Sequence, residues 1–269
     1  GQGACRRHGS ETGLGATAAA ETLTQQTDGR SRNKGMQRPA RVCDRAAMSD
    51  AGHAVPPSGP PSTRTTMARG AARADYRIET VLSIIDAAPI CHVAVTGEDG
   101  PLVLPMAHGR IGGTLYLHGA LANSILNTGL VGGLCATFTC LDGLVVARSP
   151  LHNSMNYRCA VVLGTPHRID GGEKAAALRA VSEHVAPAWS HGRAPSEQEL
   201  RRTLVVGMAI EEASAKVRSG DPLDEPEDLD GPWWAGTVPL TSAWGEPVDA
   251  ADLGPGIAVP PAISSFAGG

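Results

Sequence analysis

The chain has 269 residues, a formal net charge of −4 and 42% hydrophobic residues, enough for one sizeable domain or two small ones. It contains no apolar run near the roughly 20 residues of a membrane-spanning helix, which excludes a transmembrane protein, and its pI near 6.1 argues against nucleic acid as the main partner. The six cysteines form no CxxC pair, and the four from Cys91 onward lie in apolar segments, where a free cysteine acts as a small core residue. We therefore expect a reducing, cytoplasmic setting.

The first 66 residues differ in composition from the rest of the chain. They hold nine Lys or Arg, five Asp or Glu, and no Phe, Tyr or Trp. Such a segment buries too little apolar area to offset its ordering entropy, so we predict a disordered N-terminal extension over residues 1–66. A basic nucleic-acid arm and a targeting peptide are the alternatives, but the segment has no apolar signal core and carries too many acids for a transit peptide. We place the globular domain at 67–245 and a loose C-terminal tail at 246–269.

Helical spacing begins at Tyr76–Ala88, where apolar residues recur at i, i+3, i+4 and i+7. Asp75 is the expected N-cap of this helix, and Pro89 ends it. The same kind of spacing and capping predicts three further helices, at Ala120–Leu130, Glu173–Val185 and Ser196–Thr203.

Short apolar runs with turn signals between them predict the strands. "GEDG", "GRIGG" and "LDG" each place Gly where a tight hairpin needs it. The expected strands are Ile90–Thr96, Leu102–His108, Thr114–His118, Leu134–Leu141, Gly143–Arg148, Tyr157–Arg168, Thr203–Ala209 and Gly236–Leu240. Since strands outnumber helices and most neighbours are joined by hairpins, we predict a mainly β fold, an antiparallel barrel with flanking helices packed outside.

Common catalytic and metal-binding signatures are missing from the sequence. There is no GxGxxG in a βαβ context, no Walker A, no GxSxG and no HExxH. Of the nine histidines, His184 and His191 are spaced by seven residues, which is not a usual ligand spacing, so we predict no metal site. Cys91 and His92 are neighbours on a strand and point to opposite faces, which excludes a Cys–His nucleophile. No residue stands out as a catalytic acid or base.

Five motifs occur in order between residues 70 and 245: "TLYLHG", "LDGLVVARS", "HNSMNYR", "EEASAKVRSG" and "WAGTVPL". Together they resemble the pyridoxamine 5′-phosphate oxidase-like, flavin-nucleotide-binding family, in its branch related to nitroimidazole-resistance proteins. The resemblance implies a split antiparallel β-barrel, a homodimer, and FMN bound at the dimer interface. This agrees with the barrel that the hairpins predict.

The resemblance implies two groups of FMN-binding residues. In the first, His118 and Gly119 precede a helix start, a suitable anion site for the phosphate. Relatives often carry a cation in this turn, whereas here the matching residues are Asn123 and Ser124, so we expect weakened FMN binding, with His118 as a substitute cation or simply a histidine at the barrel rim. The strand Pro105, Met106 and Ala107 matches the one that runs along the flavin ring, although Met106 replaces a common Thr and would otherwise fill the core.

The second group is the densest polar cluster of the chain, and Lys216 is added to it as a spare cation. We expect phosphate or ring contacts there; the alternative is that its arginines form structural ion pairs with Glu211 or Glu212. The cluster comprises Arg148, Ser149, Ser154, Asn156, Tyr157 and Arg158.

The resemblance implies an FMN-dependent oxidoreductase or nitroreductase of unknown substrate, with the flavin supplying the redox chemistry. Two alternatives remain open: a flavin- or haem-binding protein without turnover, and a related barrel that uses a deazaflavin. The expected partners are a flavin nucleotide, an unknown small-molecule substrate and a second copy of the chain, with no nucleic acid and no membrane.

Overall fold

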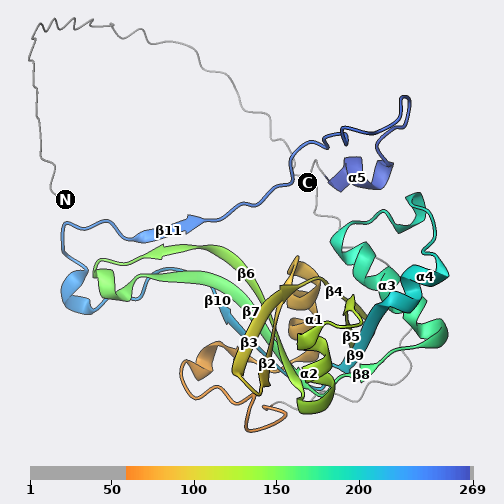
Figure 1. Ribbon diagram of the computed structural model, residues 1–269. Helices are drawn as coiled ribbons and strands as arrows, with labels where there is room; N and C mark the ends of the chain where they lie inside the picture. The colour runs from red at the N-terminus through yellow and green to blue at the C-terminus, as the bar shows by residue number, and fades with distance from the viewer. Residues whose placement is uncertain (1–58, 267–269) are drawn as a thin grey trace, which may run out of the picture. The chain divides into compact units, whose positions relative to one another are not determined.

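The computed structural model describes residues 59–266, in which the strands form two antiparallel sheets (Figure 1). The larger sheet has seven strands in the order β1-β10-β7-β6-β2-β3, with β11 paired to β6. Its strands are β1 (Ala74–Asp75), β2 (Cys91–Gly97), β3 (Gly100–Met106), β6 (Leu134–Val146), β7 (Ser154–Gly164), β10 (Glu212–Arg218) and β11 (Gly236–Pro239).

The smaller sheet has four strands in the order β4-β5-β9-β8. They are β4 (His108–Ile111), β5 (Thr114–Ala120), β8 (His167–Arg168) and β9 (Thr203–Ala209). Both sheets contribute to one apolar core, in which Val93, Phe138 and Val162 from the larger sheet pack with Leu115 and Leu204 from the smaller one. The prediction of a mainly antiparallel β fold with flanking helices is confirmed.

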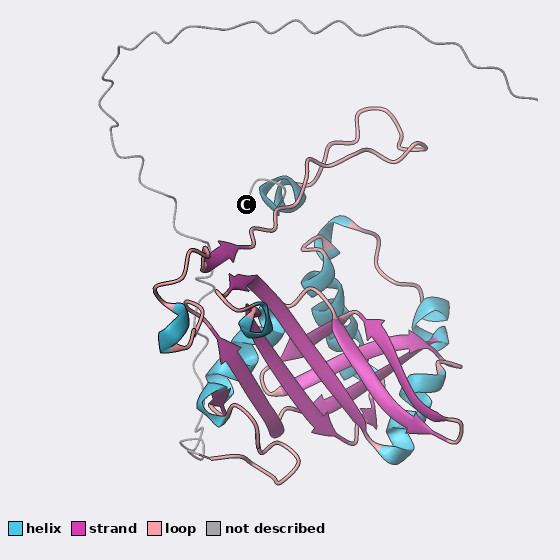
Figure 2. Ribbon diagram, turned by 90° about the vertical axis from the view of Figure 1, so that its left-hand side faces the viewer, coloured by secondary structure: helices cyan, strands magenta, loops and turns pink. Residues whose placement is uncertain are grey.

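Helices cover the flanks of the sheets, as Figure 2 shows. The main ones are α1 (Ile78–Ala87), α2 (Ser124–Gly132), α3 (Gly171–Val185), α4 (Glu197–Arg202) and α5 (Pro261–Phe266), joined by 3₁₀ turns at η1 (Ala71–Arg73), η2 (Pro150–His152), η3 (Trp189–His191) and η4 (Pro226–Asp228). Helix α1 buries Val81 and Ile85 of the expected stripe, and also Ile84. Its N-cap position is Arg77 and not the expected Asp75, which belongs to β1. None of the described helices combines the length and apolar character needed to cross a membrane.

One predicted hairpin is wrong. The "LDG" segment is not a turn, because β6 runs unbroken from Leu134 to Val146 with a register shift between Leu141 and Gly143. Asp142 is the extra residue of this bulge, and its carboxylate accepts hydrogen bonds from the guanidinium of Arg158 on β7, at 2.8 Å from Nη2. Gly143 has φ +158°, and a Cβ there would lie 2.6 Å from the backbone oxygen of Val238, so the close approach of β11 requires glycine.

Two other strands are divided differently from the prediction. The segment expected as one strand over Tyr157–Arg168 forms β7 and β8, which belong to different sheets. Likewise the chain leaves β3 at Met106, passes Ala107 and enters β4 of the other sheet. Strand β10 was not predicted, because its sequence "EASAKVR" is short of large apolar residues even though Ala213, Ser214 and Ala215 are buried.

The boundary expected at residue 66 falls within a structured segment. Residues 1–58 lie outside the described residues, but Ser62 and Arg64 both donate hydrogen bonds to the carboxylate of Glu212 at the start of β10. Thr65 is buried, at 4% exposure, and the backbone N–H of Met67 donates to the hydroxyl of Tyr76 at 3.1 Å. Contacts with the barrel strands and with Tyr76 therefore begin at Ser62, before the expected boundary.

Two truncations test this boundary. Removing residues 1–58 should leave the melting temperature unchanged, because their composition supplies no core-forming residues. Removing residues 1–66 should lower it by a few degrees, because Glu212 loses its partners and the buried Thr65 is lost. Scanning calorimetry of both variants beside the full chain gives the comparison, and equal melting temperatures for the two truncations would contradict the assignment.

Candidate functional site

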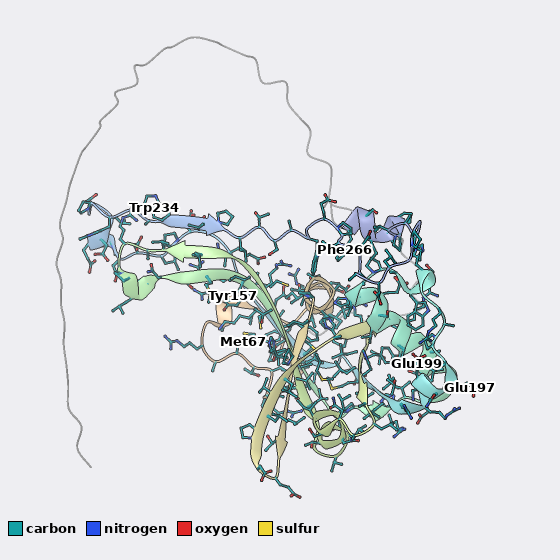
Figure 3. All side chains as sticks on the ribbon, turned by 45° about the horizontal axis from the view of Figure 1, so that its top comes forward. Met67, Tyr157, Glu197, Glu199, Trp234 and Phe266 are labelled. Carbon is teal, nitrogen blue, oxygen red and sulfur yellow. The ribbon has the colours of Figure 1, made fainter. Side chains whose placement is uncertain are left out.

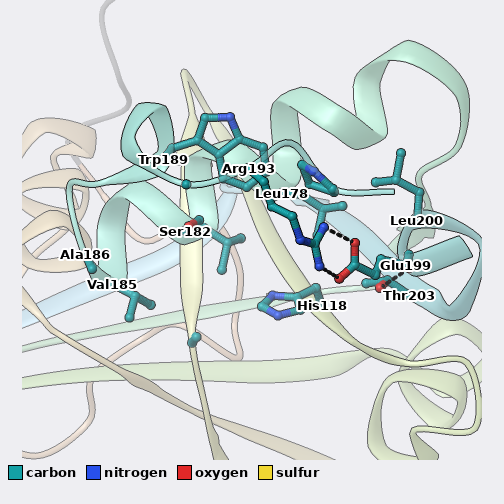
Figure 4. A pocket seen from close by; sticks show the side chains of 14 residues that line it. His118, Leu178, Ser182, Val185, Ala186, Trp189, Arg193, Glu199, Leu200 and Thr203 are labelled. Atoms are coloured by element: carbon teal, nitrogen blue, oxygen red, sulfur yellow. Dashed lines mark hydrogen bonds and ion pairs between the residues drawn. The ribbon is translucent and has the colours of Figure 1, made fainter. Parts of the chain in front are cut away.

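A cavity of about 710 Å³ opens between the smaller sheet, helix α3 and the segment from η3 to α4 (Figure 4). Its volume lies in the range of small-molecule and cofactor sites. Most of the wall is apolar, and the larger apolar side chains are Leu178, Val181, Val185, Trp189 and Leu200. The polar side chains are His118, Ser182, Arg193, Glu199 and Thr203. The cavity thus offers an apolar surface with polar groups in a few places.

His118, on β5, contributes an imidazole ring to the cavity wall. Its Nδ1 atom is buried and has no hydrogen-bond partner in the described part of the chain. Burial lowers the pKa of His118, because desolvation disfavours the charged imidazolium. A lowered pKa disfavours the substitute cation expected at this position.

Arg193 and Glu199 form a bidentate ion pair, which lies above His118 in the view of Figure 4. The distances are 2.8 Å from Nη1 to Oε2 and 2.6 Å from Nη2 to Oε1. The arginine side chain is 72% exposed, so water screens this pair and it contributes little to stability. Glu199 also closes the capping box of α4, accepting from the backbone N–H of Ser196 at 2.7 Å.

The first group of predicted flavin residues lies next to this cavity. Ala107 and His118 line it directly, and Pro105 and Met106 occupy the end of β3 that leads to it. Met106 is half-buried and packs against the main core, as its alternative interpretation held. The structure thus brings the end of the predicted flavin strand beside His118.

The helix start is later than predicted. Gly119 and Ala120 still belong to β5, and α2 begins at Ser124. Asn123 is the N-cap, because its Oδ1 accepts from the backbone N–H of Leu126 at 3.0 Å, a role that Ala120 cannot fill. A Cβ on Gly119 would lie 2.7 Å from Nδ2 of Asn123, so glycine makes room for the cap. Ser124 is exposed at the first position of the helix, where an anion would be favoured.

The second group lies away from the cavity, on the hairpin of β6 and β7 and on β10. In Figures 1 and 3 this hairpin, which carries Tyr157, extends to the opposite side of the molecule from Glu199. Ser149 and Ser154 flank the 3₁₀ turn η2 at its end, and Lys216 pairs in register with Cys159 of β7 and Ala74 of β1. One copy of the chain does not bring the two predicted groups together.

The arginines of this second group do form ion pairs, but with other partners than Glu211 and Glu212. Arg148 binds Asp224, whose side chain is 2% exposed, through its backbone N–H and its Nη1, both at 2.8 Å. Arg158 binds Asp142 in the bulge of β6. The amide oxygen of Asn156 accepts from the buried guanidinium of Arg218. These contacts hold the hairpin and the following loop in place.

The sequence prediction missed the residues that complete the cavity, chiefly Ser182, Trp189, Arg193 and Glu199. Trp189 and Arg193 lie in "APAWSHGRAP", a stretch of Pro, Gly and Ala that reads as a loop. A large aromatic residue in such a loop was the available signal, since an exposed loop has no need of a tryptophan. Their meeting with His118 depends on how α3 packs on β4 and β5, which no local pattern specifies.

Strand β3 forms the free edge of the larger sheet, with apolar side chains on both faces. Leu102, Val103 and Leu104 are 41%, 55% and 41% exposed. An exposed apolar edge strand is a site where a further chain pairs or packs, because the backbone groups along its outer edge are open to pairing and its apolar side chains are exposed. Strand β3 ends at Met106, one residue before Ala107 in the cavity wall.

The comparisons with known proteins give one family model and several similar structures. The family model described as pyridoxamine 5′-phosphate oxidase matches residues 77–217. The structure is similar to the flavocytochrome Anf3 from Azotobacter vinelandii, with a TM-score of 0.74 and 35% identity over 77% of this chain and 98% of that one. It is also similar to the FAD and heme binding protein from Mycobacterium smegmatis, with a TM-score of 0.69 and 32% identity over 72% of this chain and 97% of that one.

A weaker likeness joins the chain to a putative 5-nitroimidazole antibiotic resistance protein from Bacteroides thetaiotaomicron, with a TM-score of 0.44 and 25% identity over 54% of this chain and 86% of that one. No curated protein sequence gives a significant match.

Proposed function

The chain belongs to the pyridoxamine 5′-phosphate oxidase family, and from that premise we propose that it is a redox protein that binds a flavin nucleotide and a haem. The observation that carries the proposal is the pair of relatives at 35% and 32% identity, one a flavocytochrome and the other an FAD and heme binding protein. A bound flavin would supply hydride or electron transfer, and the protein would supply position and electrostatics.

The flavin residues that we propose are those beside the cavity. The backbone of Pro105–Ala107 would run along the ring, and the start of α2 at Ser124 would face the phosphate with its free N–H groups. Asn123 is committed to capping α2, which leaves this turn without a charged side chain. The phosphate end is therefore supported by the helix dipole and hydrogen bonds alone.

The lack of a cation in this turn bears on which flavin is bound. The phosphate of FMN concentrates nearly two charges on one group, whereas the FAD diphosphate spreads about two charges over two groups, so a single turn without a cation has less charge to compensate for FAD. The relative from Mycobacterium smegmatis is described as an FAD and heme binding protein. We therefore favour FAD over the FMN expected from the sequence, and keep FMN as the alternative.

A homodimer is part of the proposal, because the two predicted groups of flavin residues lie apart in one chain. A second copy packed along the exposed edge of β3 would cover Leu102, Val103 and Leu104. The hairpin residues Arg148 and Arg158 would then approach the site from the partner copy. Light scattering of the flavin-loaded protein tests this, and a monomer at all concentrations would refute it.

The proposal is tested by titrating the flavin-free full-length chain with FAD, FMN and riboflavin, and measuring the quenching of flavin fluorescence. We expect FAD to bind most tightly and riboflavin most weakly, because riboflavin has no phosphate. Bleaching of the bound flavin by NADH or NADPH would favour an oxidoreductase or nitroreductase over a protein that only binds the cofactor. Absence of flavin binding would refute the flavoprotein assignment and leave the deazaflavin alternative.

Placing a cation at the helix start should tighten FMN binding. Ser124→Arg adds a charge-assisted contact to the phosphate at an exposed position, and about tenfold tighter binding is expected. The matched control is Val131→Arg, which adds the same charge at a position that is 88% exposed near the other end of α2. Equal FMN affinities for the two variants would show that the phosphate does not lie at this turn.

A further inference from the structure

We propose that the cavity beside α3 binds the haem and that His118 is the iron ligand. This inference rests on the proposed function, which gives the chain a haem without assigning its place or its ligand. Three features of the described residues support it: the apolar wall, a histidine in that wall, and an arginine at the cavity mouth.

The wall suits a porphyrin better than a flavin ring. A porphyrin presents two large apolar faces, whereas the flavin ring presents polar atoms along one edge that need several hydrogen-bond partners. Leu178, Val185 and Leu200 contribute apolar side chains to the cavity wall, and Trp189 adds a broad aromatic face (Figure 4). The volume of about 710 Å³ is in the range of sites for ligands as large as a cofactor.

His118 has the chemistry of an axial ligand. The Nδ1 atom of His118 is buried, so Nε2 is the ring nitrogen that can meet an iron in the cavity that this residue lines. Iron binds an imidazole through one ring nitrogen, and a histidine in an apolar wall is a common axial ligand of haem. Two other buried imidazole nitrogens lack partners among the described residues, in His108 and His152, but neither of those residues lines the cavity.

Arg193 is placed to bind the carboxylates of the porphyrin. Its side chain is 72% exposed at the cavity mouth, and its guanidinium already holds a carboxylate by two hydrogen bonds, that of Glu199. Glu199 keeps its capping-box bonds to Ser196 when Arg193 turns away, so the exchange of one carboxylate for another leaves α4 capped. The charged edge of the porphyrin thereby stays in water while its apolar part is buried.

Titration of the full-length chain with haemin, followed by the Soret band, tests the assignment. Replacing the ligand in His118→Ala should weaken haemin binding at least tenfold and shift the Soret band, and added imidazole should restore the band. Ser182→Trp fills the cavity without touching the ligand and should also lose haemin. The matched controls are His152→Ala, which removes another imidazole with an unpartnered nitrogen, and His191→Ala, which removes an exposed histidine two residues from Arg193.

FAD titration of each variant reports folding independently of the haem. Loss of haemin by His118→Ala with FAD binding retained and both controls unchanged supports the inference. Unchanged haemin binding by His118→Ala, or loss by His191→Ala instead, overturns it while the proposed function stands. A wild-type chain that binds FAD but no haemin also overturns it, and a chain that binds neither refutes the proposed function as well.

Discussion

Replacing Gly109 with alanine should lower the melting temperature by about 6–12 °C, which corresponds to about 3 kcal/mol of overpacking in a domain of this size. Gly109 lies on β4 beneath α3, and a Cβ there would lie 2.5 Å from the backbone carbon of Ala180 and from the backbone nitrogen of Val181. Backbone atoms inside a helix do not rotate aside, so α3 has to shift as a whole.

The same variant should weaken ligand binding in the cavity, because α3 supplies Leu178, Val181 and Ser182 to its wall. Gly113→Ala is the matched control, since it lies in the turn between β4 and β5 and a Cβ there would meet nothing within 4 Å. Scanning calorimetry of both variants gives the comparison. A melting temperature for Gly109→Ala equal to that of the control would mean that the backbone of α3 does not pack directly against Gly109 of β4.

Acidification from pH 6.5 to pH 5 should cost the folded state about 2 kcal/mol through His108 alone. His108 is fully buried, with its ring 4.8 Å from Phe138 and 4.2 Å from His184, measured between ring centroids. Its Nε2 donates to the carbonyl oxygen of Ile85 at 3.0 Å, and its Nδ1 has no partner among the described residues. Burial lowers the pKa of His108 from 6.5 to about 4, with a smaller contribution from His184.

The direction follows from proton uptake. Between pH 6.5 and about 4 the imidazole is protonated in the unfolded chain and neutral in the folded one, so the unfolded state binds more protons and stability falls as the pH falls. The stabilisation is complete above pH 6.5. Carboxylates with lowered pKa values, such as Asp75 and Glu212, act mainly at lower pH.

Urea unfolding at pH 7.5, 6.5 and 5 measures the effect of His108. His108→Met keeps a similar volume without a titratable group and should show the weaker pH dependence, whereas His92→Gln, at an exposed position of β2, should follow the wild type. If the free energy of unfolding falls equally for His108→Met and the wild type between pH 6.5 and 5, His108 is not the source of the pH dependence.

The sequence predicts most elements because their patterns are local. Helix α1 keeps its apolar stripe, and β2, β5 and β9 are close to the ranges expected from alternating apolar runs. The failures come from non-local pairing. At "LDG" the turn residues form a bulge, because Asp142 pairs with Arg158 on the neighbouring strand β7 and Gly143 leaves room for β11. Strand β10 is held by its neighbours on both sides, and its small residues give no apolar pattern to detect.

The candidate site is only partly predictable for the same reason. Both His118 and Ala107 were identified through the resemblance, His118 just before the predicted helix start and Ala107 in the strand expected to run along the flavin ring. Their neighbours Trp189 and Arg193 come from a loop more than sixty residues later in the chain, and only the seating of α3 brings them together. The lowered pKa of His118 could not be predicted from the sequence either, because it results from burial, which is a property of the fold.

The visible spectrum of the purified full-length chain tests the central claim most directly. After saturation with FAD and haemin and removal of the unbound cofactors, we expect the bands of an oxidised flavin together with a Soret band. Denaturation should then release FAD and haem in equal amounts, one of each per chain. A protein that stays colourless after this treatment would contradict the assignment of a flavin and haem redox protein.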